Sequence, residues 1–238
     1  EVLQLSPFEV RSEKDTGYVA SSSLADTRIN AELWTTPSAI SVMTQEFIED
    51  TGALDVKSIL DYSLNASFDY GDVTGASTAH SDFGALQIRG FRDAQLGRNY
   101  FLWRLNSDRF NVERIDLSRG PNSVLYGQGS PGGIINTSTK RARIGQDVDA
   151  LTVRIGSFDD YRAELDFGRT LAKERFAVRA NLLYQDRQGY REFEKLRRAS
   201  GALAATWRPF KSTEIRFDGE YGDVDQVVAL PWPAHEIH

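Results

Sequence analysis

The 238-residue chain contains no cysteine, one methionine and only three histidines. The absence of cysteine excludes a disulfide framework and a thiolate metal site, and it is neutral about the cellular compartment. Two of the histidines, His235 and His238, stand in the run HEIH, one residue closer together than the spacing of a zinc-binding helix. His80 is isolated in the sequence. We therefore expect no metal site and no cofactor.

Long apolar runs and a basic field are also missing. No apolar run approaches the roughly 18 residues that a membrane-spanning helix needs. The first residues, EVLQLSPFEV, have neither the basic start nor the apolar core of a signal peptide, so we expect any leader to have been removed. A net charge of −6 and an isoelectric point of about 5.2 argue against a nucleic-acid partner. There is no nucleophile elbow and no metal ligand set, so the sequence does not indicate an enzyme.

What is present begins with a polar arm, residues 1–30. A small apolar cluster at Val2, Leu3, Leu5 and Phe8 stands out within it. Two interpretations remain open. The arm is either an ordinary frayed terminus, or a peptide that a partner's sheet edge binds through backbone hydrogen bonds.

Residues 31–145 predict a compact α+β unit. Thr44 and Asp55 are good helix N-caps, each followed by helix-forming residues. The Gly-, Ser- and Thr-rich stretch Asn65–Ser81 predicts a loop. Apolar and β-branched runs predict strands at Ser38–Met43, Ala85–Arg89, Tyr100–Trp103, Val112–Leu117 and Gly133–Thr139.

Residues 146–238 show apolar and charged side chains in strict alternation. In DYRAELDF, for example, Tyr161, Leu165 and Phe167 alternate with Arg162 and Asp166. A period of two predicts antiparallel strands with one apolar and one polar face. The same period recurs at Leu151–Ile155, Phe176–Tyr184, Leu203–Trp207 and Ile215–Tyr221.

Two environments accept such strands. A soluble sheet buries its apolar face in a core, whereas a transmembrane barrel turns that face to lipid. Short connections at Leu171–Arg175 and Pro209–Thr213, with a long one at Arg187–Arg198, give the short–long alternation of outer-membrane barrels. The short link SFD, at residues 157–159, runs against that alternation.

The run GQGSPG (residues 127–132) has the spacing of a dinucleotide-binding fingerprint. That fingerprint needs a helix to begin at its third glycine, because the helix N-terminus binds the pyrophosphate. Here the β-branched run GIINTST follows and predicts a strand. We therefore interpret Gly127, Gly129, Gly132 and Gly133 as positions of positive φ or close packing in a tight turn.

Two segments, ALQIRGF (residues 85–91) and VERIDLSRGPNSVLYGQGSPGGIINTSTKRA (residues 112–142), resemble the plug domain of TonB-dependent outer-membrane receptors. The resemblance implies an arm with a candidate TonB box at residues 1–30, an α+β plug domain at 31–145, and the first antiparallel strands of a transmembrane β-barrel at 146–238. Such barrels have about 22 strands, so we expect the chain to be a fragment of a longer receptor.

The resemblance also implies a function, which is energy-coupled uptake of a scarce solute across the outer membrane of a Gram-negative bacterium. The plug gates the barrel lumen and the arm lies in the periplasm. The implied partners are the periplasmic C-terminal domain of TonB, outer-membrane lipid, and a small ligand such as a ferric siderophore, cobalamin or an oligosaccharide. The sequence does not choose among these ligands. A soluble β-rich module that binds carbohydrate is the alternative.

Three groups of residues are candidates for function. For Arg89 and Arg119, pairing with acidic residues on the barrel wall and hydrogen bonding within the plug are both open. For the ligand-facing group, plain solvated loops are the alternative. The TonB-coupling arm comprises Val2, Leu3, Leu5, Pro7 and Phe8; the plug motif comprises Arg89, Gly90, Arg119, Gly120, Pro121, Tyr126, Gly127, Gly132, Gly133 and Asn136; the ligand-facing group comprises Asp69, Tyr70, Asp72, His80, Tyr100, Phe101 and Trp103.

Overall fold

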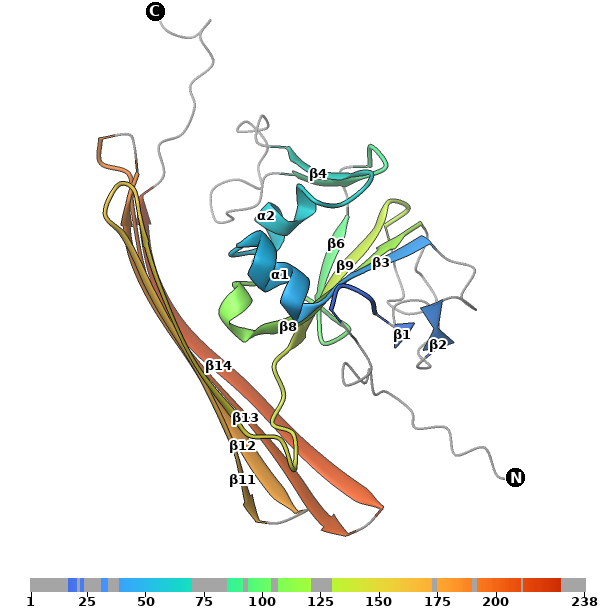
Figure 1. The fold of residues 1–238 in the computed structure, drawn as a ribbon. Helices are drawn as coiled ribbons and strands as arrows, with labels where there is room; N and C mark the ends of the chain where they lie inside the picture. Colours follow the sequence, from blue (N-terminus) through green and yellow to red (C-terminus); the bar gives the residue numbers. More distant parts are fainter. Residues whose placement is uncertain are drawn as a thin grey trace, which may run out of the picture. The chain divides into compact units, whose positions relative to one another are not determined.

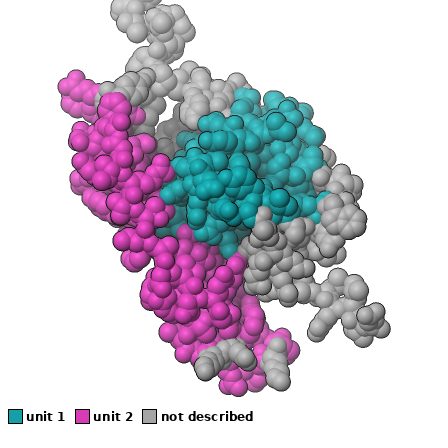
Figure 2. All heavy atoms as spheres, viewed as in Figure 1, with its two compact units in different colours: residues 1–139 teal, residues 140–238 magenta. Residues whose placement is uncertain are grey.

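The computed structural model divides the chain into two compact units, Glu1–Thr139 and Lys140–His238 (Figure 2). In the part of the chain that it describes, no helix is long and apolar enough to cross a bilayer. The structure describes residues 17–20, 22–23, 31–33, 39–69, 85–91, 94–103, 107–120, 130–172, 175–189, 192–210 and 212–227.

The first unit is built on a five-stranded sheet in the order β3-β8-β9-β6-β7 (Figure 1). Neighbouring strands are antiparallel, except that β6 runs parallel to β9. Two further hairpin-like pairs, β1 with β2 and β4 with β5, stand outside this sheet. The elements are β1 Ser22–Ser23, β2 Ala31–Glu32, β3 Ala39–Met43, α1 Gln45–Thr51, α2 Val56–Leu60, β4 Ala66–Asp69, β5 Ala85–Ile88, β6 Gln95–Arg98, β7 Phe101–Leu102, a 3₁₀ turn Arg109–Asn111, β8 Val112–Arg119 and β9 Gly133–Thr139.

Both helices begin where the sequence predicts, at side chains that satisfy free backbone N–H groups. The Thr44 hydroxyl accepts a hydrogen bond from the N–H of Phe47 ahead of α1. Asp55 and Ser58 cap α2 reciprocally, each side chain bonding to the other residue's backbone N–H. Each helix also has an apolar face. These faces pack against the sheet, so the helices and the sheet share one hydrophobic core. Its most deeply buried members are Ile59, Leu60, Ile88, Ile115, Leu117 and Ile135.

Two parts of this unit differ from the prediction. The stretch Asn65–Ser81, expected as a loop, begins with β4, and the strand expected at Tyr100–Trp103 is reduced to β7 with an unexpected strand, β6, before it. Both β4 and β6 are short and contain polar residues or glycine, so their own residues carry no clear period. Their hydrogen-bonding partners, β5 and β9, lie far along the chain, and these tertiary pairings make them strands.

The second unit is an antiparallel meander in which β10 to β14 pair in chain order (Figure 1). Each strand is long enough to cross the hydrocarbon part of a bilayer when tilted, which takes about 9–11 residues. The strands are β10 Val148–Gly156, β11 Asp160–Ala172, β12 Phe176–Gln188, β13 Lys195–Phe210 and β14 Thr213–Val227.

The prediction of a long connection at Arg187–Arg198 is wrong. Strand β12 continues to Gln188 and β13 begins at Lys195, so only residues 189–194 connect them. The short–long alternation of connections that the sequence suggested is therefore weak. Charged residues extend the ladder here because they pair across it, as Arg197 does with Asp186 at 3.1 Å.

The two faces of the meander decide between the two environments considered above. Tyr161 and Leu165 on the apolar face of β11 are 52% and 40% exposed, whereas Arg162 and Asp166 on its polar face are 2% and 7% exposed. A soluble sheet would bury the apolar face. The observed arrangement is the one in which the apolar face meets hydrocarbon.

Candidate functional site

The glycine motif runs into β9, and its described glycines, Gly132 and Gly133, occupy positions without room for a side chain. Gly133 has a φ of +134°, and a Cβ there would collide with the carbonyl oxygen of Ser118. A Cβ on Gly132 would come within 3.0 Å of the Ile88 carbonyl oxygen. The Gly120 N–H donates to the Gly132 carbonyl at 2.9 Å and links the residues that adjoin the end of β8 and the start of β9. Since a strand and not a helix follows Gly132, the run GQGSPG does not build a phosphate site.

Arg119, at the end of β8, connects three segments of the first unit. Its Nε donates to the Leu64 carbonyl and its Nη1 to Ser41 Oγ, both at 2.9 Å. Within the described chain, its Nη2 is buried without a hydrogen-bond partner. Burial lowers the pKa of the Arg119 guanidinium, and the nearby charge of Arg89 lowers it further. Arg119 therefore has bonds that fix loops within the unit, and one donor that those bonds leave unused.

The sequence missed a buried charged pair next to this motif. Arg114 Nε and Asp116 Oδ1 lie 2.9 Å apart on β8, and both side chains are almost completely buried. The Tyr100 hydroxyl donates to Asp116 at 3.2 Å, and the Tyr100 N–H donates to Asn136 Oδ1 at 2.8 Å. The only signal in the sequence was the presence of charged residues inside a strand whose ends are apolar, VERIDL.

One face of the motif strands is therefore polar as well as buried. Asp116 and Asn136 are direct partners across β8 and β9, and both are 0% exposed. In the described residues, the amide nitrogen of Asn136 and the hydroxyls of Ser118 and Ser138 are buried without hydrogen-bond partners. Exposing buried polar atoms of this kind to water costs little free energy, because water supplies the hydrogen bonds that they lack.

The candidate ligand-facing residues divide into different surroundings. Phe101 on β7 is 77% exposed, whereas Tyr100 is half-buried with a positive φ of 68° and the bonds described above. Trp103 is half-buried, with the Arg98 guanidinium 5.0 Å from its ring centroid. Asp69 ends β4. The other candidates of the three groups lie outside the described residues: Val2, Leu3, Leu5, Pro7, Phe8, Tyr70, Asp72, His80, Pro121, Tyr126 and Gly127.

These features define a class of protein: a small α+β unit with closely packed glycines at the start of β9 and a buried polar face, followed by antiparallel strands that expose their apolar face. Residues 32–134 match the family model of the TonB-dependent receptor plug domain. The chain belongs to the TonB-dependent receptors, which are proteins of the Gram-negative outer membrane.

Similar proteins agree with this assignment. The chain is 29% identical over 235 residues to the metal-pseudopaline receptor CntO of Pseudomonas aeruginosa, covering 92% of this chain and 31% of that receptor. It is 31% identical over 166 residues to the probable TonB-dependent receptor BfrD of Bordetella pertussis, covering 66% of this chain and 20% of the relative. The fold matches P. aeruginosa FpvA bound to a ferric pyoverdine with a TM-score of 0.81 and 20% identity, over 92% of this chain and 29% of FpvA. The chain thus spans less than a third of the length of these proteins.

Proposed function

We propose that the chain is the plug-bearing part of a longer outer-membrane receptor that takes up a metal chelate, such as a ferric siderophore, at the expense of energy delivered by TonB. Residues 1–30 form the coupling arm, 31–145 the plug, and 146–238 the first barrel strands. The observation that carries the proposal is that the meander β10 to β14 exposes its apolar face and buries its polar face. On β11, for example, Leu165 is exposed while Asp166 beside it is buried. A lumen with polar walls needs a gate, and the plug motif supplies it.

The similar proteins support the proposed ligand class. CntO is named as a metal-pseudopaline receptor, and the FpvA structure contains a ferric pyoverdine. Both ligands are metal chelates, which favours a chelate over cobalamin or an oligosaccharide for this chain. The soluble carbohydrate-binding alternative would require the apolar face of β10 to β14 to be buried, and that face is exposed. We assign the chain binding and gating, without an enzymatic reaction.

The buried polar face of β8 and β9 suits the plug to movement within a channel. A domain that shifts within a channel exposes surfaces that were buried, and apolar surface costs about 25 cal/mol for every Å² exposed to water. The polar face of β8 and β9 avoids that cost. Atoms of Asn136, Ser118 and Ser138 that have no hydrogen-bond partner in the described chain can bond to water when this face is exposed.

Named residues then take roles in gating and binding. Arg119 stabilises the closed plug through its bonds to Leu64 and Ser41, and its unused Nη2 is available to an acidic group of the barrel wall. Arg89 lies close enough to lower the pKa of Arg119 and acts with it. Phe101, which is exposed on β7, is placed to meet a ligand. The remaining plug motif residues are Gly90, Gly120, Pro121, Tyr126, Gly127, Gly132, Gly133 and Asn136, and the remaining ligand-facing residues are Asp69, Tyr70, Asp72, His80, Tyr100 and Trp103.

Uptake by the complete receptor tests the proposal. Cells that lack their own siderophore receptors should accumulate ⁵⁵Fe from ferric pyoverdine, ferrioxamine B or another ferric chelate of the panel only when receptor and TonB are both present. Labelled cobalamin and a maltodextrin serve as controls. Uptake of a control and of no chelate would refute the ligand class, and undiminished uptake without TonB would refute the coupling.

The arm has a test of its own. A peptide of residues 1–12 should bind the C-terminal domain of TonB and gain strand structure, because its backbone groups can pair with a sheet edge while the apolar side chains of Val2, Leu3, Leu5 and Phe8 fill pockets beside it. A peptide with Leu3 and Leu5 changed to Asp is the control. Normal transport by a receptor without residues 1–12 would contradict the assignment of the arm.

A further inference from the structure

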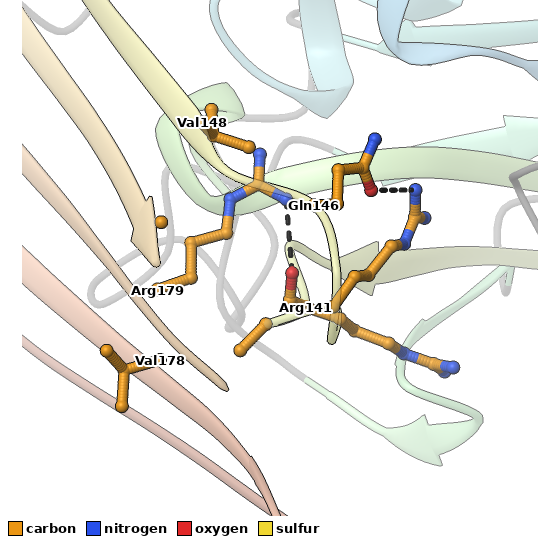
Figure 3. A pocket seen from close by; sticks show the side chains of 8 residues that line it. Arg141, Gln146, Val148, Val178 and Arg179 are labelled. Atoms are coloured by element: carbon orange, nitrogen blue, oxygen red, sulfur yellow. Dashed lines mark hydrogen bonds between the residues drawn. The ribbon is translucent and has the colours of Figure 1, made fainter. Parts of the chain in front are cut away.

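The segment that joins the two units, residues 140–147, is bound along the strands of the second unit; we call it the strap. Side chains of the sheet hold its backbone. Arg179 Nη1 donates to the Arg141 carbonyl at 3.2 Å (Figure 3), and Thr206 Oγ1 donates to the Ala142 carbonyl at 2.6 Å. These bonds reach backbone atoms of the strap. They therefore depend on the side chains of Arg179 and Thr206 and not on the side chains of Arg141 and Ala142. We call the sheet residues that hold the strap wall residues.

The other end of the strap is bound to β11. The Gly145 N–H donates to Thr170 Oγ1 at 2.8 Å, and the Thr170 N–H donates to Asp147 Oδ1 at 3.0 Å. The strap is thus hydrogen-bonded near both of its ends before β10 begins.

One buried carboxylate organises the network. Asp166 Oδ2 lies 2.9 Å from Lys140 Nζ, the first residue of the strap, and Arg179 holds both Asp166 oxygens at 2.8 Å. The Asn181 amide nitrogen, in the orientation that satisfies its neighbours, donates to the same oxygens at 3.0 and 3.3 Å. Asp166 therefore binds Lys140 directly and also orients the guanidinium that holds the Arg141 carbonyl. Removing such a carboxylate leaves the buried cations Lys140 and Arg179 without their shared counter-ion, which is strongly unfavourable.

Small side chains let the strap approach the sheet closely. Ala142 is 4% exposed and packs against Ala177 and Ala204, with Ile144 beside them. A small pocket lined by Arg141, Gln146, Val148 and their neighbours remains next to these contacts (Figure 3). The strap combines charge-assisted hydrogen bonds with alanine packing, so it is attached more firmly than a simple linker.

We propose that the strap is a fixed anchor that ends the movable part of the plug at Thr139. The inference rests on the proposed function, in which a pull on the arm displaces the plug. When the plug extends, the chain detaches up to Lys140 and stops there, because the wall residues Asp166, Arg179 and Thr206 hold the next segment. A plug displaced in this way stays attached beside its own lumen and refolds in place when the pull ends.

Force measurement on the complete receptor in a lipid bilayer tests the anchor. With a handle at Glu1, extension of the wild type should stop after about 140 residues, or roughly 500 Å of chain, and a second rupture should follow roughly 30 Å later when the strap detaches. In Asp166→Asn the first stop should be lost, so extension runs on to the second.

Asp149→Asn is the matched control. Asp149 also forms a two-bond pair with an arginine of the neighbouring strand, Arg169, at 2.7 and 2.8 Å, but it has no bond to the strap. This variant should keep the first stop. A wild type that extends through Lys140 without stopping, or an Asp149→Asn variant that behaves like Asp166→Asn, would overturn the proposal.

A cysteine pair makes the test independent of whether Asp166→Asn folds. Ala142→Cys with Ala204→Cys ties the strap to the sheet when oxidised. If the strap is an anchor, the oxidised and reduced receptors reach the same first stop. If oxidation shortens the first extension by roughly 15–20 Å, which is the length of the five residues between the disulfide at 142 and the end of the strap, the strap normally detaches with the plug and the proposal is wrong. Failure of chelate uptake would count against the proposed function and would leave this measurement unchanged.

Discussion

The Tyr18 hydroxyl donates a 2.7 Å hydrogen bond to Asp50 Oδ2 on helix α1. The Tyr18 ring also stands edge-on to Phe47, with ring centroids 5.2 Å apart. Beside it, the Gly17 carbonyl accepts a 2.7 Å hydrogen bond from the hydroxyl of Thr44, the N-cap of the same helix. Residues 17 and 18, within the arm, are therefore fastened to α1, and a pull on the first residues of the arm reaches this helix before the central sheet.

Replacing Tyr18 with Phe tests that attachment, because it removes the hydrogen bond and keeps the ring contact. In Tyr18→Phe we expect hydrogen exchange in α1 to be faster than in the wild type, and exchange in α2 to change less. Tyr62→Phe is the control, since Tyr62 also contacts the Phe47 ring, at 5.9 Å. Equal exchange in Tyr18→Phe and the wild type would show that the bond does not stabilise the helix.

The same contact should depend on pH. The hydrogen bond to the Asp50 carboxylate raises the pKa of Tyr18 above its usual value of about 10. A group whose pKa is raised by folding stabilises the folded state below its unfolded pKa, and this contribution is lost as the pH rises through the folded pKa. Protection of α1 should therefore fall at strongly alkaline pH in the wild type and change less in Tyr18→Phe.

Gly133→Ala should destabilise the plug by about 2–4 kcal/mol, because the new Cβ adds a clash with the Ser118 carbonyl to an unfavourable φ. Gly90→Ala separates the two causes. Gly90 has a φ of +80° but no atom within 4 Å of the added Cβ, so we expect about 1 kcal/mol there. Urea unfolding of residues 31–145, which we expect to be soluble alone, measures both. Equal costs would show that close packing at Gly133 is unimportant.

The contrast between β9 and β6 explains how far the sequence alone could predict the plug. The prediction Gly133–Thr139 matches β9 in both bounds, because a β-branched run between glycine and a charged segment limits the strand locally. Strand β6 has the residues QLGR, and what makes it a strand is its partner β9, which no local pattern reveals. The caps at Thr44 and Asp55 were predictable for the same reason as β9, since a cap bonds within its own first turn.

The site was less predictable than the fold. Period two in β11 indicated which side chains share a face, but Asp166, Arg179 and Lys140 come from three separate segments. A carboxylate that binds two cations from distant segments has no sequence signature. Likewise, Arg187–Arg198 was expected as a connection because it is long, charged and aromatic, and cross-strand pairing, as between Arg197 and Asp186, makes half of it strand.

Permeability tests whether Arg119 closes the plug. In the complete receptor, Arg119→Ala should admit a large antibiotic that porins exclude, and Arg119→Lys should not restore closure, because an ammonium group lacks the fork that reaches Leu64 and Ser41 together. Ser41→Ala distinguishes the two interpretations of this arginine. If it leaks as much as Arg119→Ala, bonds within the plug explain closure; a leak in Arg119→Ala alone favours pairing with the barrel wall. Unchanged permeability in all variants would exclude both.

The orientation of the meander is tested by a charge placed on either face. Leu203 is 50% exposed on the apolar face of β13, and we expect Leu203→Lys to destabilise the receptor by roughly 2–4 kcal/mol, the cost of a lysine at the bilayer midplane. Asp218 pairs with Ala204, whose buried side chain belongs to the polar face, so Asp218→Lys should be tolerated. Resistance of the folded barrel to heat and SDS measures both variants. A receptor that tolerates Leu203→Lys as well as Asp218→Lys would show that the apolar face does not meet lipid, and the assignment of β10 to β14 to a membrane barrel would then be wrong.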